Sequence, residues 1–102
     1  MATLNLAYTA KAIRLLHEIL GFVAQENPDA ASKISERIEH GLDRLRVFPE
    51  SGRKIPEAPE RRERELVIPP CVRIFYRVGG DTLWVIHVMR AEQAFKTVPL
   101  DE

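Results

Sequence analysis

The sequence contains a single cysteine, Cys71, so no disulfide can form within the chain. One cysteine without a partner fits a reducing cytoplasm. Cys71 starts a predicted strand and has no base beside it, so we interpret it as a small buried side chain rather than a nucleophile. No stretch approaches the ~18 consecutive apolar residues of a membrane span, and the N-terminus lacks a basic segment followed by a long apolar run. We therefore expect a cytoplasmic protein that does not cross a membrane.

An excess of charge of one sign is also absent, because 15 basic residues balance 15 acidic ones. Global charge therefore gives no argument for a nucleic-acid or membrane partner. The three histidines, His17, His40 and His87, lack the clustered spacing of metal ligands, so we assign them structural roles and predict no metal and no cofactor. The sequence has no phosphate-binding loop, no G-x-S-x-G motif and no C-x-x-C pair.

The N-terminal half predicts one strand and two helices. Residues 3–8, TLNLAY, alternate between apolar and polar side chains, which is typical of a strand. Thr9 and Asn27 are good N-caps, Pro28 suits a first helical position, and Pro49 ends the second helix. Apolar residues recur at helical spacing: Ile13, Leu16, Ile19, Leu20 and Val23, then Ile34, Ile38, Leu42, Leu45 and Phe48. A connection of about three to five residues predicts an antiparallel helical hairpin. Gly41 either permits close packing or is a tolerated surface glycine.

The C-terminal half predicts a polar loop followed by a three-stranded meander. Residues 49–64, PESGRKIPEAPERRER, form the loop, and RELVI (64–68) is a strand ended by Pro69-Pro70. Two further strands flank Gly79-Gly80. The expected fold is a two-layer α+β domain in which the first strand joins one edge of the meander and the helical hairpin packs on one sheet face. Residues 1–95 form this single domain, and residues 96–102 a short polar tail.

The two faces of the C-terminal hairpin differ in composition. With Gly79-Gly80 as the turn, Tyr76 opposes Leu83, Phe75 opposes Trp84, Arg73 opposes Ile86 and Arg77 opposes Thr82. The predicted helix-facing set is Val72, Ile74, Tyr76, Val78, Leu83, Val85, His87 and Met89.

The other face is expected to be open, since two helices can cover only one face. It carries the candidate target-binding residues Arg73, Phe75, Arg77, Trp84, Ile86 and Arg90, of types enriched at protein interfaces. The alternative is a solvated face whose arginine stems cover the aromatic rings. Weaker candidates are Arg53, Lys54, Arg62, Arg64 and Glu65, and for these cations a solvated loop is the alternative.

The order of three segments resembles the RelE/ParE toxin superfamily of type II toxin–antitoxin systems. These are ENPDAASKISERIEHGLDRLRVFPESGR, RELVI and RIFYRVGGDTLWVIHV. The resemblance covers about residues 3 to 93, and the ParE-like branch is the more similar. It implies a toxin that inhibits DNA gyrase. It also implies a hetero-oligomer in which a cognate antitoxin, ParD-like or another small DNA-binding antitoxin, neutralises the toxin.

RelE-type members instead cleave mRNA on the ribosome, and this remains the first alternative. Such chemistry needs an acid, a base and cations. Tyr76 and His87 are expected to face the core, and only Glu65 could reach the open face, so the sequence favours binding over catalysis and no catalytic residue is assigned. No direct specific nucleic-acid binding is expected. Arg90 and Glu92 stand where the family often has His and Arg, which motivates a second alternative, a detoxified binding module.

Overall fold

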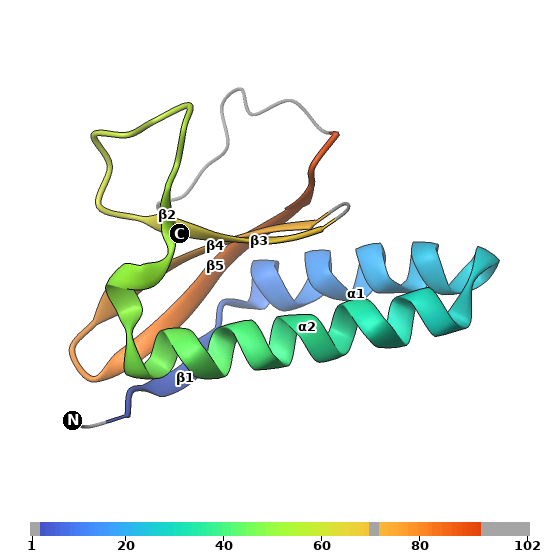
Figure 1. Cartoon of the computed structure of the whole chain (residues 1–102), viewed down its shortest axis with the longest axis horizontal. Helices are drawn as coiled ribbons and strands as arrows, with labels where there is room; N and C mark the ends of the chain where they lie inside the picture. The colour runs from blue at the N-terminus through green and yellow to red at the C-terminus, as the bar shows by residue number, and fades with distance from the viewer. Residues whose placement is uncertain (1–2, 70–71, 93–102) are drawn as a thin grey trace.

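The computed structural model describes residues 3–69 and 72–92. In chain order the elements are β1 (Asn5–Tyr8), α1 (Ala10–Glu26), α2 (Pro28–Val47), η1 (Pro49–Ser51), β2 (Arg53–Lys54), β3 (Arg64–Ile68), β4 (Val72–Gly79) and β5 (Thr82–Arg90). Helices and sheet form two layers, which confirms the predicted α+β class (Figure 1). The predictions for Cys71, for the domain boundary at residue 95 and for the tail lie outside the described residues.

Both helices begin where their caps predict. The Thr9 side chain accepts a hydrogen bond from the Ala12 amide at 3.1 Å, and the Asn27 side chain accepts one from Ala30 at 3.0 Å. Asn27 alone separates α1 from α2, so the predicted connection of three to five residues was too long. Asn27 ends α1 and also caps the first turn of α2, so one residue is enough to connect the two helices. No helix among the described residues is both long and apolar enough to cross a membrane.

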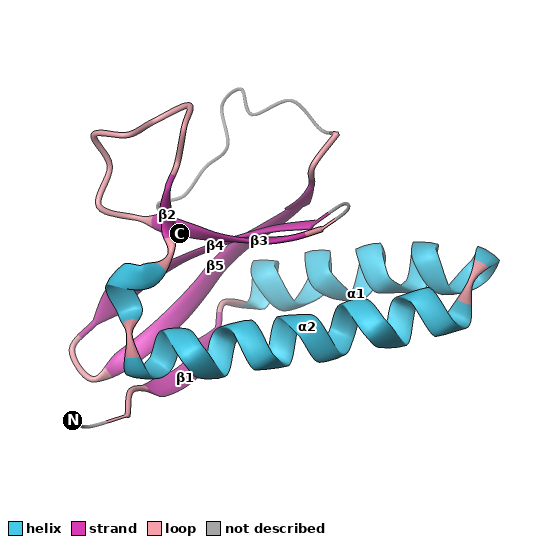
Figure 2. Cartoon of the chain, viewed as in Figure 1, coloured by secondary structure: helices cyan, strands magenta, loops and turns pink. Residues whose placement is uncertain are grey.

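The sheet has five strands in the order β1-β5-β4-β3-β2. The meander β3-β4-β5 is antiparallel as predicted, and β1 joins its edge in parallel with β5. Strand β2 was not predicted: Arg53 and Lys54 extend the other edge by pairing with Glu65 and Arg64. Both helices lie against one sheet face (Figure 2).

Most of the predicted helical stripes form the main core. It includes Leu16 and Ile19 of α1 and Ile38, Leu42 and Leu45 of α2, packed on the sheet. Ile13 and Phe48 were predicted to be buried with them, and this was wrong: they are 42% and 55% exposed. Phe48 lies beyond the last turn of α2, where the chain leaves the helical direction.

Gly41 marks a close approach of α2 to the sheet. A Cβ atom at this position would lie 2.6 Å from a methyl carbon of Leu66 on β3. The glycine therefore permits close helix–sheet packing, which decides between its two interpretations.

The hairpin between β4 and β5 turns one residue later than predicted. Gly80 and Asp81 occupy the turn, and Gly80 has a φ of 61°, which glycine adopts readily. Val78 consequently opposes Leu83, and Arg77 opposes Trp84. The predicted cross-strand pairs were therefore wrong.

A β-bulge in β5 then changes which side chains face the helices. Tyr76 pairs with Val85 but Phe75 pairs with His87, so Ile86 is an extra residue on β5. After Ile86, the side chains of β5 no longer keep the alternation between the two sheet faces that the first half of the strand shows. Val88 joins the main core, whereas Met89 packs with Phe75 and Ile86 on the opposite face.

The bulge overturns three further predictions. His87 and Met89 were expected on the helix-facing side, but the His87 ring lies 5.9 Å from the ring of Phe75 and Met89 belongs to the second cluster. Arg90 was expected on the opposite face. Instead its guanidinium lies over the ring of Phe22 on α1, 5.1 Å from the centroid.

The second sheet face is covered over Phe75, Ile86 and Met89, so the prediction of an open face was wrong for this part of it. Residues 55–63, which we call the cover segment, lie over it. Ile55 and Ala58 pack with Phe75, Ile86 and Met89 in a second apolar cluster. Two reverse turns, in which Ala58 and Arg61 donate backbone hydrogen bonds to Ile55 and Ala58, shape the segment. Burial of apolar side chains explains why a polar-looking loop packs on the sheet.

Candidate functional site

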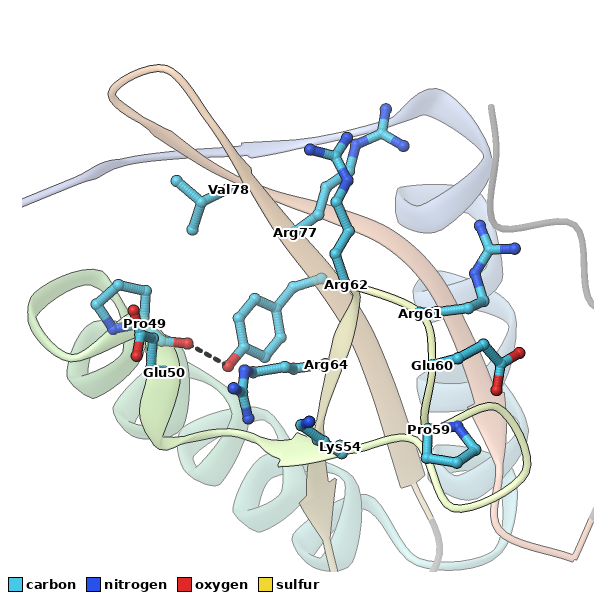
Figure 3. Close-up of a pocket in the computed structure, with 11 residues that line it drawn as sticks. Pro49, Glu50, Lys54, Pro59, Glu60, Arg61, Arg62, Arg64, Arg77 and Val78 are labelled. Carbon is cyan, nitrogen blue, oxygen red and sulfur yellow. Dashed lines mark hydrogen bonds between the residues drawn. The ribbon is translucent and has the colours of Figure 1, made fainter.

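A groove of about 630 Å³ opens at the edge of the sheet beside the cover segment (Figure 3). Its lining carries five cations, Lys54, Arg61, Arg62, Arg64 and Arg77, against two carboxylates, Glu50 and Glu60. Tyr76 and Val78 contribute from β4, and Pro49 and Pro59 from the flanking loops. We call this the cationic groove. Its charge balance favours an anionic or acidic ligand.

One wall of the cationic groove is built by the turn after α2. Pro49 starts η1, and the Ser51 hydroxyl donates to the Phe48 carbonyl at 2.7 Å. The Tyr76 hydroxyl donates to the Pro49 carbonyl at 2.6 Å, which fixes the turn against β4. Gly52 lies so close that a Cβ atom there would be 2.0 Å from the Tyr76 hydroxyl oxygen. Pro49 and Gly52 of the FPESGR sequence thus lie against the phenol ring of Tyr76.

The cations of the groove divide into held and available groups. Arg64 donates to the Gly52 carbonyl at 3.0 Å, and Arg61 pairs with Glu63 at 3.0 Å. Lys54, Arg62 and Arg77 make no ion pair or side-chain hydrogen bond with any residue in 3–69 or 72–92. These three side chains are therefore the ones that a ligand can engage without breaking an internal contact.

Arg73 lies outside the groove in a buried ion network. Its Nε donates to Glu65 at 2.7 Å, and its two terminal nitrogens donate to Glu57 at 3.0 and 2.8 Å. Arg53 donates to the other oxygen of Glu65 at 2.7 Å. The hydrogen bonds that Arg73 donates to Glu57 and Glu65 raise the pKa of Arg73, although burial opposes the rise. The same hydrogen bonds to Glu57 lower the pKa of that carboxyl group. The network ties the cover segment to β3 and β4.

The structure separates the residues predicted to form one target-binding patch. Phe75 and Ile86 are buried beneath the cover segment, and Arg73 is buried in its ion network. Arg90 lies on the helix side, where it also pairs with Glu92 at 3.3 Å. Arg77 and Trp84 remain together as a cross-strand pair, and Trp84 is 36% exposed. Glu65 does face the second sheet face, but it is buried between two arginines.

Sequence reasoning placed Arg77 among the main candidates, ranked three other cations of the groove as weaker candidates and left Arg61 out. Lys54, Arg62 and Arg64 were among those candidates, and all three line the groove. The run ERRER at residues 60–64 indicates a cluster of cations, but a run of mixed charge is also typical of a solvated loop. Within the described residues no group of three or more His, Cys, Asp or Glu side chains could hold a metal ion.

Comparison with known proteins identifies the class of protein. The family described as the ParE toxin of the type II toxin–antitoxin system, parDE, matches residues 6–95. The chain belongs to the ParE toxin family. It is therefore a toxin of the type II toxin–antitoxin class, in the RelE/ParE superfamily.

Two curated relatives and one solved structure agree with this assignment. The Sinorhizobium fredii protein Y4kP, named as a candidate toxin, is 32% identical over 99 residues, covering 96% of this chain and 99% of that protein. Toxin RelE2 of Caulobacter vibrioides is 28% identical over 90 residues, covering 88% and 94%. A chain of the chromosomal ParDE system from P. aeruginosa superposes with a TM-score of 0.70 at 22% identity, covering 88% of this chain and 98% of that chain. That last likeness concerns the fold alone.

Proposed function

We propose that this ParE-family toxin acts by binding and inhibiting a cytoplasmic target, DNA gyrase, and that a cognate antitoxin holds it inactive in a hetero-oligomer. The observation that carries the proposal is the Arg77–Trp84 pair at the border of the cationic groove. It joins an exposed aromatic ring to a cation that makes no ion pair in the described structure. Aromatic and arginine side chains are the usual anchors of protein interfaces.

The buried candidates support the proposal only indirectly. Phe75, Ile86 and Arg73 fix the cover segment, and the cover segment supplies Arg61 and Arg62 to the groove. Their side chains cannot touch a partner because they are buried beneath the cover segment. We therefore move the target-binding role to Arg77, Trp84, Lys54 and Arg62.

The state of the titratable groups favours binding over acid–base chemistry. The Glu65 carboxylate is buried between Arg53 and Arg73 and lies away from the groove. The Tyr76 hydroxyl is engaged by Pro49, and burial raises its pKa above the ordinary value of 10.0, so it stays protonated at neutral pH. A protonated phenol cannot act as a general base.

Cleavage of mRNA is the second candidate function, and one observation favours it. Tyr76 lines the groove beside Lys54 and Arg64, so a protonated phenol and cations surround the same hollow. To protonate a leaving oxygen, this hydroxyl would have to release the Pro49 carbonyl, while the cations would neutralise phosphate charge.

Gyrase supercoiling in the presence of purified toxin tests the proposal. We expect micromolar toxin to block supercoiling and leave transcripts intact on translating ribosomes. Cleaved transcripts with unaffected gyrase would replace the proposal by the endonuclease. The detoxified alternative predicts that expression without antitoxin does not arrest growth.

A further inference from the structure

The sheet face opposite the helices has an exposed part beside the β4–β5 turn. Leu6 and Leu83 pack in the main core, so their neighbours along β1 and β5 point to the opposite face. The cover segment packs farther along this face, over Phe75, Ile86 and Met89. Six residues that pair across three strands form the exposed part, which we call the Trp84 shelf: Asn5, Ala7, Arg77, Gly79, Thr82 and Trp84.

Small residues flank the Trp84 ring on this shelf. Ala7 on β1 pairs with Trp84, and Gly79 lies diagonally across from it on β4. A Cβ atom at Gly79 would lie 3.7 Å from Cδ1 and 3.9 Å from Nε1 of the indole, so the ring lies next to this glycine. Because Gly79 has no side chain and Ala7 has only a methyl group, neither covers the indole. The ring is therefore accessible to a planar group of a ligand.

Two cations lie close to this ring. Arg77 pairs with Trp84 across the strands, and both Arg77 and Arg62 line the cationic groove. Figure 3 shows these two arginine side chains at the same end of the groove. Neither forms an ion pair with any residue that the structure describes. An aromatic ring beside arginines is the combination with which proteins hold single-stranded nucleic acids, since bases stack on the ring and phosphates bind the cations.

The composition of the shelf favours a nucleobase over a protein side chain. Trp84 is its only large apolar residue, whereas the centre of a protein interface gathers several. The Asn5 amide and the Thr82 hydroxyl lie on the same face and can form hydrogen bonds with the edge of a base. Neighbouring bases cover both faces of a paired base in a duplex, so only an unpaired base can stack on the indole.

We propose that the Trp84 shelf stacks on an unpaired base of the DNA that gyrase holds, while Arg62 and Arg77 bind the flanking phosphates. This inference rests on the proposed inhibition of gyrase, and it adds the DNA to the target. Stacking and phosphate contacts do not depend on base sequence, so the contact agrees with the expectation that the toxin reads no specific sequence. The exposed Arg77–Trp84 pair thereby gains a ligand of defined chemistry.

The fluorescence of Trp84 tests this contact directly, because the chain has no other tryptophan. The probe is a single-stranded oligothymidine dodecamer, titrated into the full chain at low salt. We expect it to quench the fluorescence, since a stacked base changes the surroundings of the indole. An abasic strand of the same length keeps the phosphates but cannot stack. We expect the abasic strand to bind about tenfold more weakly and to leave the fluorescence unchanged.

Matched variants separate stacking from charge, with binding measured by the fluorescence anisotropy of a labelled strand. Trp84→Ala should weaken binding of the thymidine strand about tenfold, and Trp84→Phe, which keeps an aromatic ring, should weaken it less. Arg62→Gln should weaken binding several-fold and reduce its dependence on salt, because one phosphate contact is lost. Arg14→Gln, which replaces an exposed arginine on α1, should change neither property.

Three results would overturn stacking at the shelf. These are equal affinity for the thymidine and abasic strands, binding of the thymidine strand without a change in fluorescence, and no binding at millimolar strand. Tighter binding of an oligouridine dodecamer than of the thymidine strand would replace DNA by RNA as the ligand.

The supercoiling assay separates this inference from the proposed function. Quenching by the thymidine strand with unaffected supercoiling leaves the shelf standing as a DNA-binding site and rejects gyrase as the target. Inhibited supercoiling without quenching leaves the target standing and rejects the DNA contact.

Discussion

Arg73 and Glu57 form a two-point ion pair in which Nη1 lies 3.0 Å from Oε2 and Nη2 lies 2.8 Å from Oε1. Glu57 belongs to the cover segment and Arg73 to the middle of the sheet. The pair therefore fixes a loop that sequence reasoning left in solvent, and through it the position of Arg61 and Arg62 in the cationic groove.

Substitution of Arg73 should lower the free energy of unfolding more than substitution of its partner Glu57. Arg73→Ala removes one of the two arginines that bind Glu65, which is 1% exposed, and leaves Arg53 on its other oxygen. We expect a loss of about 3–5 kcal/mol. Glu57 has a 40% exposed side chain, so Glu57→Gln should cost less than about 1 kcal/mol. Urea denaturation followed by circular dichroism measures both. Equal losses for the two variants would contradict this account.

Acid should loosen the cover segment through Glu57. The pKa of Glu57 in the folded chain is below its ordinary value of 4.5 because Arg73 donates hydrogen bonds to the carboxylate. A depressed pKa contributes stability that is present above pH 4.5 and is lost as the pH falls through the folded value. We expect wild-type Tm to drop more steeply below pH 4.5 than that of Glu57→Gln. Identical dependence of Tm on pH in the two proteins would show that the Glu57–Arg73 ion pair does not contribute to stability.

Two glycines should respond in opposite ways to alanine. Gly52→Ala places a Cβ atom 2.0 Å from the Tyr76 hydroxyl oxygen, and we expect a loss of about 1–3 kcal/mol. Gly21 has no atom within 4 Å of such a Cβ and lies inside α1, so Gly21→Ala should stabilise by up to about 1 kcal/mol. Thermal melts compare the two. In a Tyr76→Phe background the cost of Gly52→Ala should shrink, since the hydroxyl is gone.

Substitutions in the Arg77–Trp84 pair should weaken target binding but leave the fold stable. Arg77→Gln and Trp84→Ala are each expected to cost about 2 kcal/mol of binding, roughly a 30-fold rise in the toxin concentration that half-inhibits supercoiling. Arg14→Gln and Phe22→Ala, an exposed cation and an exposed aromatic residue on α1, serve as matched controls. Full activity of both pair variants would move the target-binding surface elsewhere.

Most of the fold could be read from local signals. Thr9, Asn27 and Pro28 specify the helix starts because their hydrogen bonds and dihedral preferences act within one turn. The order of β3, β4 and β5 followed from their short connections, whereas β2 and the choice of β5 as the neighbour of β1 did not. The hairpin register could not be read in the same way, because Gly79-Gly80 and Gly80-Asp81 are both acceptable turns and only the packed sheet selects one.

The candidate site was less predictable than the fold. Alternation placed Arg90 beside Arg73 and Arg77, and one extra residue at Ile86 moved Arg90 to the helix side. The polar composition of the cover segment predicted a solvated loop. Instead, Ile55 and Ala58 bury their side chains against Phe75, Ile86 and Met89. Both errors arose because long-range packing overrode a local pattern.

The sequence by itself determined the α+β class, the capped helices, most of the apolar residues of the main core and the resemblance to a toxin family, since each depends on local propensity or on residue order. Only the tertiary structure decided which residues are available to a partner. The bulge and the cover segment exist because they bury apolar surface on the second face of the sheet, and that burial withdraws Arg73, Phe75 and Ile86 while gathering Lys54, Arg62 and Arg77 around one groove.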